Sequence, residues 1–223
     1  MKTFDELYRI AADRKGGPEA FEATLTTPKT PEELAAIPDD RWLSTMSKCI
    51  FQAGFNWKVV ENKWPAFEEV FHDFDVARAA FMTDEDIETL LSDKRIIRNG
   101  AKIAAIRDNA QFLADLAKER GWAARFLAEW PGEVEVGRLG VLKQRGTRLS
   151  GNTGMYLLRF MGCDSFILSR DVVTALAREG VVDVAATSKR DRLKAQQAFN
   201  QWREESGRPF THISRVLACT VGD

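Results

Sequence analysis

The sequence predicts an all-α protein with two helical lobes and a groove between them. Helix caps recur along the chain, apolar residues repeat at spacings of three and four, and no alternating strand pattern of useful length is present. The expected loops are short, which favours a compact body. We expect one domain over 1–223, with extra helices over 1–40, a lobe over 41–130 and a second part over 137–223.

Polar residues that cap helices mark the expected helix starts in the first half. They are Thr30, Asp39 or Asp40, Asn56, Asp75 and Thr83. Thr30 also has Glu33 three residues on, which is a capping box. The helix from Asn56 is expected to end at Val60, and a separate helix is expected to open at Trp64 because proline follows it.

The second half is expected to be helical as well. The predicted elements are a long helix from Asn99 to a stop at Gly121, helices over 122–130, 153–161 and 171–178, a polar helix from Thr187 or Ser188 to about Glu205, and a last apolar helix over 213–218. The long helix carries one apolar stripe, formed by Ile103, Ile106, Ala110, Leu113 and Leu116. Pro131-Gly132 is the clearest break, and a basic loop is expected before 153.

Composition excludes several classes of protein. The hydrophobic content of 44% and charged content of 29% are those of a folded domain rather than a disordered chain. No apolar run reaches the roughly 20 residues of a membrane helix, and the N-terminal residues lack a secretory apolar region. Cys49, Cys163 and Cys219 are scattered and form no C-x-x-C. We therefore expect a cytoplasmic protein without disulfides, membrane partner or thiolate metal site.

The formal net charge of −1 hides an asymmetry along the chain. Residues 1–93 hold 10 Lys/Arg and 19 Asp/Glu, whereas residues 94–223 hold 22 and 14. Two acid-free basic stretches lie in the second part, with Lys94, Arg95, Arg98, Lys102 and Arg107 in one and Arg138, Lys143, Arg145, Arg148 and Arg159 in the other. One such stretch would indicate a solvated face, but two in the same half favour a phosphate-binding face.

The second basic stretch runs into a glycine-rich turn at the start of a helix. The turn residues are Gly151, Asn152, Thr153, Gly154 and Met155. The first N–H groups of a helix lack backbone partners and carry the positive end of its dipole, so they bind phosphate well. We expect this turn, with Lys143, Arg145 and Arg148, to bind DNA phosphates; the alternative is an ordinary interhelical turn.

Four motifs together resemble the DNA-3-methyladenine glycosylase I family, within the helix–hairpin–helix DNA glycosylase superfamily. Residues 52–57 read Q-A-G-F-N-W, residues 71–75 read F-H-D-F-D, residues 96–110 read I-I-R-N-G-A-K-I-A-A-I-R-D-N-A, and residues 151–156 read G-N-T-G-M-Y. The resemblance is densest over 47–116 and thinner over 145–176.

The resemblance implies a monofunctional DNA repair enzyme. Such an enzyme hydrolyses the N-glycosidic bond of an alkylated purine, with 3-methyladenine the first expectation, after flipping the base out of double-stranded DNA. Its base pocket would use Cys49, Gln52 and Trp57, with Trp57 stacking on the base and Gln52 hydrogen-bonding its edge. A core position is the alternative for Trp57. We expect a monomer, and no lyase step because the hairpin lacks the lysine of bifunctional relatives.

The departures from the family concern its charged and metal-binding residues. Cys49 stands where the family has a glutamate, and it could be a nucleophile or, more commonly, a buried apolar residue. Asp171 and Ala175 stand where the family has zinc ligands, so we expect no metal and no other cofactor. Other branches place a catalytic aspartate at the position of Ser169. Asp171 is the candidate here for acid–base work, or else it caps the following helix.

Two further functions remain open on the sequence alone. The replacement of the family glutamate by Cys49 allows a catalytically silent helix–hairpin–helix protein that binds DNA or senses damage. A helical protein-interaction domain is the third option. That option leaves both acid-free basic stretches unexplained.

Overall fold

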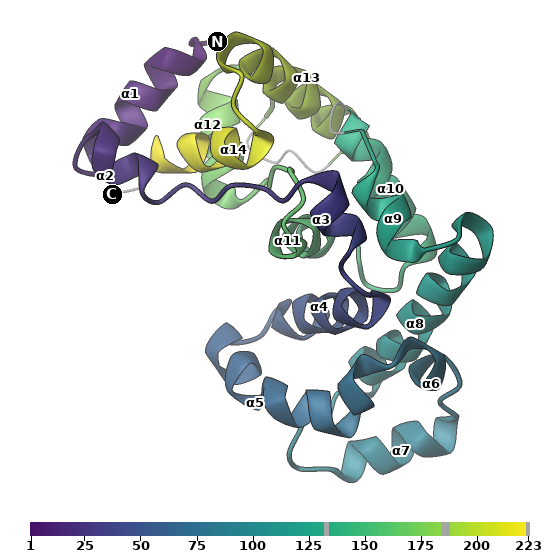
Figure 1. Cartoon of the computed structure of the whole chain (residues 1–223). Helices are drawn as coiled ribbons and strands as arrows, with labels where there is room; N and C mark the ends of the chain where they lie inside the picture. Colours follow the sequence, from purple (N-terminus) through teal and green to yellow (C-terminus); the bar gives the residue numbers. More distant parts are fainter. Residues whose placement is uncertain (132–133, 184–187, 222–223) are drawn as a thin grey trace. The chain divides into compact units, whose positions relative to one another are not determined.

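The computed structural model describes residues 1–131, 134–183 and 188–221, and every regular element in these ranges is helical (Figure 1). The α-helices are α1 (Phe4–Arg14), α2 (Pro18–Glu22), α3 (Pro31–Ala35), α4 (Asp39–Gln52), α5 (Trp57–Val70), α6 (Val76–Ala80), α7 (Asp84–Ser92), α8 (Gly100–Arg120), α9 (Ala123–Ala128), α10 (Glu135–Arg145), α11 (Asn152–Met161), α12 (Arg170–Arg178), α13 (Lys189–Ser206) and α14 (Phe210–Cys219). A 3-10 helix, η1 (His72–Phe74), lies between α5 and α6. The all-α prediction is confirmed.

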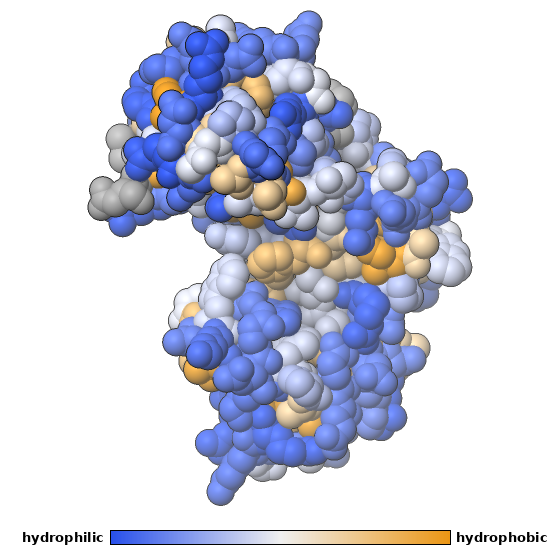
Figure 2. Space-filling view, turned by 60° about the vertical axis from the view of Figure 1, so that its left-hand side comes forward, coloured by the Kyte–Doolittle hydropathy of each residue, from blue (hydrophilic) through white to orange (hydrophobic). Residues whose placement is uncertain are grey.

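The chain forms two compact units, and each contains segments that are distant in sequence. Unit 1 consists of Met1–Lys29, Pro131–Gly137 and Gly162–Asp223, and unit 2 of Thr30–Trp130 and Arg138–Met161. The hairpin helix α11 therefore belongs to the same unit as α4, α5 and α8, rather than to the C-terminal helices. Among the described residues, no helix is long and apolar enough to cross a membrane. The face seen in Figure 2 is mostly hydrophilic, with small apolar patches.

Unit 2 is built around α8, which packs against α4, α6, α7 and α9. The predicted stripe of α8 is buried throughout, at Ile103, Ile106, Ala110, Leu113 and Leu116. Facing it, α4 buries Trp42, Leu43, Met46 and Ile50 and also contacts α11. Each Leu, Ile or Met side chain among them contributes roughly 1.5–3 kcal/mol when it is fully buried. This apolar contact fixes the places of the α4 and α11 ends that form the candidate site.

The helix break predicted at Val60 is wrong, because α5 continues unbroken from Trp57 to Val70 with Pro65 inside it. An interior proline removes one backbone hydrogen bond and costs about 3 kcal/mol. Aromatic packing on both sides of it offsets this cost. The ring of Trp64 stacks on Phe67 at 4.8 Å and on Phe74 at 5.4 Å, and all three side chains are buried.

The F-H-D-F-D motif makes a tight left-handed turn between α5 and α6. His72, Asp73 and Phe74 have φ angles of 53°, 55° and 59°, a backbone region that non-glycine residues rarely adopt. The buried rings of Phe71 and Phe74 stack at 5.4 Å and hold this turn against the core. Asp75 caps α6 as predicted, accepting a hydrogen bond from the Arg78 N–H at 2.7 Å.

Most of the other predicted helix caps are confirmed. Thr30, Asn56, Thr83, Asn99 and Ser188 all accept a backbone N–H at a helix start. The alternative cap Thr187 and the predicted break residue Gly132 lie outside the described residues.

Three predicted boundaries are wrong. Pro38, rather than Asp39 or Asp40, is the N-cap of α4, and Asp39 instead accepts the N–H of Ala124 at 3.0 Å. The expected basic loop is largely helical, because α10 spans Glu135–Arg145. Ser169 rather than Asp171 caps α12.

Unit 1 packs α1 against α13 and α14, and α14 also contacts α12. A polar network adds to this apolar contact. The guanidinium of Arg208 donates to both carboxylate oxygens of Glu22, at 2.9 and 2.6 Å, and the Tyr8 hydroxyl donates to Glu22 at 2.7 Å. Arg208 also lies over the Tyr8 ring, 5.6 Å from its centroid. The two ends of the chain are thereby joined within one unit.

The Glu22–Arg208 pair predicts a pH-dependent part of the stability. Hydrogen bonding from Arg208 holds the pKa of Glu22 below its usual value, although burial opposes this. A lowered folded-state pKa stabilises the fold above the unfolded-state pKa, and this stabilisation is lost as the pH falls through the folded-state pKa. Glu22→Gln should lower the free energy of unfolding near neutral pH by up to about 1 kcal/mol, since the pair is partly exposed.

The measurement is urea unfolding of Glu22→Gln and wild type at about pH 7 and about pH 3. The difference between the two proteins should shrink at the lower pH. Glu204→Gln is the matched control, because Glu204 is exposed and makes no ion pair with the described residues. An equal loss at both pH values would contradict the assignment to the charged pair.

Candidate functional site

A cavity of about 300 Å³ lies in unit 2 where three helix ends meet. It is formed by the end of α4, the start of α5 and the start of α11. Its lining residues are Cys49, Gln52, Ala53, Gly54, Trp57, Asn152, Thr153 and Tyr156. All three residues predicted for the base pocket thus line one cavity, together with two residues of the predicted phosphate-binding turn.

Trp57 forms an aromatic wall of this cavity rather than part of the core. Its side chain is 42% exposed, whereas the core tryptophans Trp42 and Trp202 are fully buried. The indole meets Tyr156 at 5.2 Å and Phe160 at 6.0 Å, with interplanar angles of 83° and 78°. Because these rings meet edge to face, they leave aromatic surface uncovered that a planar ligand could stack on.

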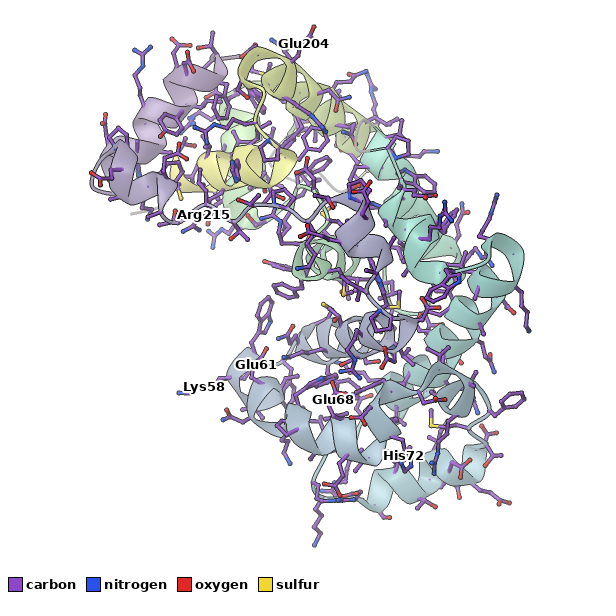
Figure 3. All side chains as sticks on the ribbon, in the orientation of Figure 1. Lys58, Glu61, Glu68, His72, Glu204 and Arg215 are labelled. Atoms are coloured by element: carbon purple, nitrogen blue, oxygen red, sulfur yellow. The ribbon has the colours of Figure 1, made fainter. Side chains whose placement is uncertain are left out.

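Gln52 is held by a charged neighbour that sequence reasoning missed. The Gln52 Nε2 group donates to Glu61 Oε1 at 3.0 Å, and Lys48 Nζ lies 2.6 Å from Glu61 Oε2. Glu61, which is labelled on α5 in Figure 3, lies four residues after Trp57 on the same helix. The predicted break at Val60 concealed this neighbour, since the spacing of four from Trp57 has meaning only on an unbroken helix.

Cys49 is buried in the cavity wall and carries a neutral thiol. Burial raises the pKa of Cys49 to about 12, so that the thiolate is scarce at neutral pH. A thiol of this kind is a poor nucleophile, and it supplies no negative charge in place of the family glutamate. Of the alternatives for Cys49, the structure therefore favours the buried apolar residue.

The turn between α4 and α5 is fixed by Lys102 of α8. The last carbonyl groups of a helix lack intrahelical partners, and Lys102 Nζ donates to two of them, Phe51 O at 3.1 Å and Ala53 O at 2.9 Å. Burial, and then the charge of Arg148, lowers the pKa of Lys102. Gly54 has a φ of 70° and turns the chain toward α5. Lys102 thus holds the segment that carries the cavity wall.

The loop before α11 is fixed by a second residue of α8. Asn109 is fully buried, and its amide makes two hydrogen bonds to the backbone of Thr147: Nδ2 donates to the carbonyl at 3.0 Å and Oδ1 accepts from the N–H at 2.9 Å. The Thr147 hydroxyl also lies 3.2 Å from Asp108 Oδ2. These hydrogen bonds position the next residue, Arg148. Its φ angle of 61° is uncommon for residues other than glycine.

Two glycines let the loop and helix α11 pack closely. A Cβ on Gly154 would lie 2.5 Å from Leu149 O, and a Cβ on Gly146 would lie 2.8 Å from Leu142 O. Helix α11 begins at Asn152, after Gly151 with a φ of 61°. The start of α11 therefore sits at the cavity, where Asn152 and Thr153 line it.

The second basic stretch offers fewer available cations than its composition indicates. Lys143 and Arg148 are exposed and make no ion pair with any residue that the structure describes. Arg145, by contrast, donates to both carboxylate oxygens of Glu119 at 2.9 and 2.8 Å, and Arg138 is buried. In this stretch Lys143 and Arg148 are thus better placed for phosphate than Arg145.

The first basic stretch also contains arginines that are already paired with acidic residues. Arg95 is paired with Asp93 and Glu69, and Arg107 is paired with Asp84. These acids lie outside the acid-free stretch in sequence but next to it in space. Counting charges along the chain therefore overestimates the free positive surface.

Asp171, the predicted acid–base residue, lies in the first turn of α12 in unit 1 and does not line the cavity. Ser169 is occupied as the cap of α12, accepting the Val172 N–H at 3.3 Å. The position of the second family zinc ligand is Ala175, which is buried and has no ligating atom. These residues do not fit a metal site, and the described residues contain no cluster of three or more His, Cys, Asp and Glu side chains.

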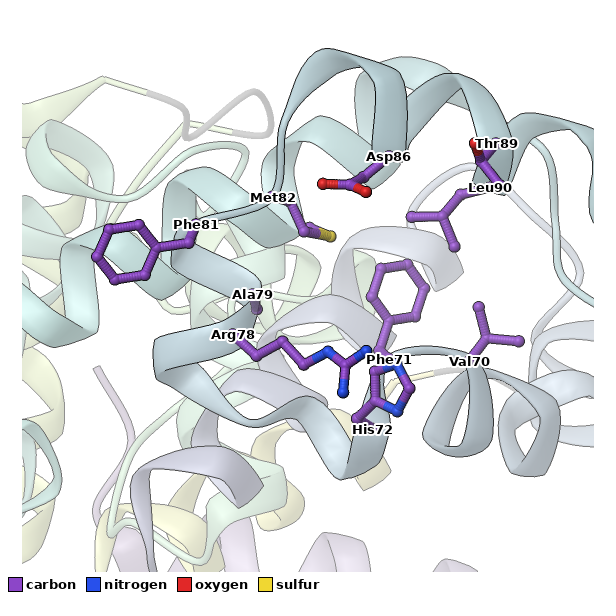
Figure 4. A pocket seen from close by; sticks show the side chains of 10 residues that line it. All are labelled: Val70, Phe71, His72, Arg78, Ala79, Phe81, Met82, Asp86, Thr89 and Leu90. Atoms are coloured by element: carbon purple, nitrogen blue, oxygen red, sulfur yellow. The ribbon is translucent and has the colours of Figure 1, made fainter.

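A second cavity, of about 360 Å³, lies between the η1 turn and α7 (Figure 4). Arg78 and His72 lie on one side of it and Asp86 on the other, around Phe71. It contains none of the predicted site residues. We place the candidate site at the smaller of these two cavities, because Trp57 meets the N-terminus of α11 there, beside Cys49 and Gln52.

Comparison with known proteins finds a similar fold and a matching family model for part of the chain. A solved structure of 3-methyladenine DNA glycosylase I from Staphylococcus aureus superposes with a TM-score of 0.52 at 20% identity, covering 70% of this chain and 91% of that one. The fold is therefore that of a DNA glycosylase of this type. Residues 37–138 match the methyladenine glycosylase family model.

Two curated relatives are each similar to about a third of this chain. DNA-3-methyladenine glycosylase 1 of Escherichia coli K12 is 43% identical over 86 residues, which are 34% of this chain and 46% of the relative. DNA-3-methyladenine glycosylase of Haemophilus influenzae is 41% identical over 69 residues, which are 31% of this chain and 36% of the relative. The chain thus matches less than half the length of each.

The close packing at Gly154 gives a test of the hairpin. Gly154→Ala should lower the free energy of unfolding by roughly 1–3 kcal/mol, because its Cβ would collide with the backbone carbonyl of Leu149. Gly140→Ala, on α10, is the matched control. A Cβ there meets nothing within 4 Å, so this substitution should stabilise by roughly 0.5–1 kcal/mol. Urea unfolding measures both variants. A change in the free energy of unfolding that has the same sign in both variants would contradict the packing described.

Proposed function

We propose that this protein is a monofunctional DNA glycosylase that hydrolyses the N-glycosidic bond of alkylated purines, with 3-methyladenine the first candidate. The observation that carries the proposal is the cavity at which Trp57 meets the N-terminus of α11. A cavity of about 300 Å³ is at the small end of ligand pockets, as a single flipped base requires. The proposed partner is double-stranded DNA that carries damaged bases.

The hairpin supports binding to the DNA backbone. The first N–H groups of α11 and the exposed cations Lys143 and Arg148 offer donors and positive charge to phosphate oxygens. Because Asn109 fixes the loop that carries Arg148, this surface is organised before DNA binds. Contacts of this kind position the duplex without reading its sequence.

The cavity suits a base that is already activated for departure. A purine alkylated at N3 is cationic while attached to the sugar, so the glycosidic bond breaks without a strong general acid. Trp57 can stack on the cationic ring, and the electron-rich face of indole favours such a ring. Gln52 lines the same cavity and is proposed to hydrogen-bond the edge of the base. Cys49, being neutral, leaves water as the nucleophile.

The same neutral thiol favours a second function. A protein without the family glutamate could hold a flipped base in the cavity and leave the bond intact, as a damage sensor would. Release of base from methylated DNA separates the two functions. Tight, salt-sensitive DNA binding without release would favour the sensor, and absence of DNA binding at low salt would contradict both.

Trp57→Ala should abolish the release of 3-methyladenine while leaving non-specific DNA binding nearly unchanged. The reason is that Trp57 belongs to the cavity wall and is 42% exposed, so its removal takes away a stacking surface without opening the core. Chromatography of released bases measures activity, and fluorescence anisotropy with an undamaged duplex measures binding. Loss of the folded state in circular dichroism would instead make Trp57 a core residue.

Arg148→Ala should weaken binding to every duplex sequence alike. If Arg148 contacts one phosphate, the slope of log K against log salt should fall by about 0.9. Lys118→Ala is the matched control: Lys118 is an exposed cation near the other end of α8, far along that helix from Lys102, and its only described ion pair is with Asp115. An unchanged slope for Arg148→Ala would exclude this arginine from the phosphate-binding surface.

A further inference from the structure

The cavity between the η1 turn and α7 shares no lining residue with the candidate site. Its volume is about 360 Å³, and all of its lining belongs to unit 2. Most of the lining is apolar, from Val70, Phe71, Ala79, Phe81, Met82 and Leu90. An apolar cavity of this size with a few polar groups on its wall is the usual form of a small-molecule site.

The ring of Phe71 gives this cavity a fixed apolar wall. Phe71 is only 4% exposed, and its ring stacks on Phe67 at 5.9 Å and on Phe74 at 5.4 Å. The wall is therefore formed before a ligand arrives, which spares the ligand the free energy of ordering it.

Two opposite charges flank this wall without binding each other. Arg78 and Asp86 are both exposed, and they line opposite sides of the cavity (Figure 4). The Arg78 guanidinium makes no ion pair with the described residues, whereas Arg95 and Arg107 of the same unit are paired. Asp86 Oδ2 accepts from the N–H and the hydroxyl of Thr83, at 2.8 and 2.9 Å. Asp86 Oδ1 has no hydrogen-bond partner among the described residues.

The two charges are close enough to act on one small ligand. Hydrogen bonds from Thr83 lower the pKa of Asp86, and the charge of Arg78 lowers it further. Arg78 and Asp86 thus interact across the cavity, although they are too far apart for an ion pair. A ligand that carries both an anionic and a cationic group would complete an ion pair with each of them.

We propose that this cavity binds a free α-amino acid with an apolar side chain. The ligand carboxylate binds the Arg78 guanidinium, whose planar N–H groups match the two oxygens of a carboxylate. The ligand ammonium group binds Asp86 Oδ1. The ligand side chain lies against Phe71 and Leu90. The site is separate from the candidate base pocket, and the inference does not depend on the proposed function.

The test is an NMR chemical-shift titration of the isotope-labelled full chain with leucine, glycine, leucinamide and N-acetylleucine. Leucine should bind with a Kd of about 1 mM or tighter. Leucinamide lacks the carboxylate and N-acetylleucine lacks the ammonium group, so each should bind at least about fivefold more weakly. Glycine lacks the apolar side chain and should bind about tenfold more weakly.

Two variants assign the two charges. Arg78→Gln should weaken leucine at least about fivefold and leave leucinamide nearly unchanged. Asp86→Asn should weaken leucine as much and leave N-acetylleucine nearly unchanged, and asparagine keeps an oxygen for the hydrogen bonds from Thr83. Arg98→Gln and Glu88→Gln are the matched controls, because both residues are exposed and neither lines the cavity. They should leave all four affinities unchanged.

The ligand series on the wild-type chain decides the inference even if a variant fails to fold. Leucine shifts confined to the lining of this cavity would support it. Absence of leucine binding, or leucine shifts centred on Trp57 instead, would overturn it. N-acetylleucine that binds as tightly as leucine would overturn it as well, because a site for the C-terminus of a protein chain would behave in that way. Equal affinities for glycine and leucine would also overturn it.

Discussion

Two attachments from one face of α8 determine the geometry of the candidate site. Lys102 binds the carbonyl groups at the end of α4, and Asn109 binds the backbone of Thr147 in the hairpin loop. Asn109 lies seven positions after Lys102, which is close to two helical turns, so both side chains project from the same side. The cavity wall and the hairpin loop are therefore positioned by a single rigid element.

The chemistry of the site follows from what this frame presents. Because the α4–α5 turn is fixed, Trp57 keeps a partly exposed ring at the cavity, next to Tyr156 of α11. Because the hairpin loop is fixed, the start of α11 reaches the same cavity. The proposed stacking surface and the proposed phosphate-binding turn thus lie in one unit of the protein, beside the buried Cys49.

The sequence predicted the helical class, most caps and the gathering of Cys49, Gln52 and Trp57, because caps and local motifs carry their signal within a few residues. It did not predict that α5 passes through Pro65, since the stacked rings that stabilise it come from separate segments. The same error concealed Glu61. Nor could charge counting show that Arg145 is paired with Glu119, which is 26 residues away in the chain.

Residue-by-residue amide hydrogen exchange in Lys102→Met and Asn109→Ala tests the dependence on α8 most directly. Exchange should become faster at 53–58 in Lys102→Met and at 146–149 in Asn109→Ala, with each variant sparing the other segment, because each attachment holds its own loop. Equal acceleration of both segments in either variant, or no local change in both, would contradict the account.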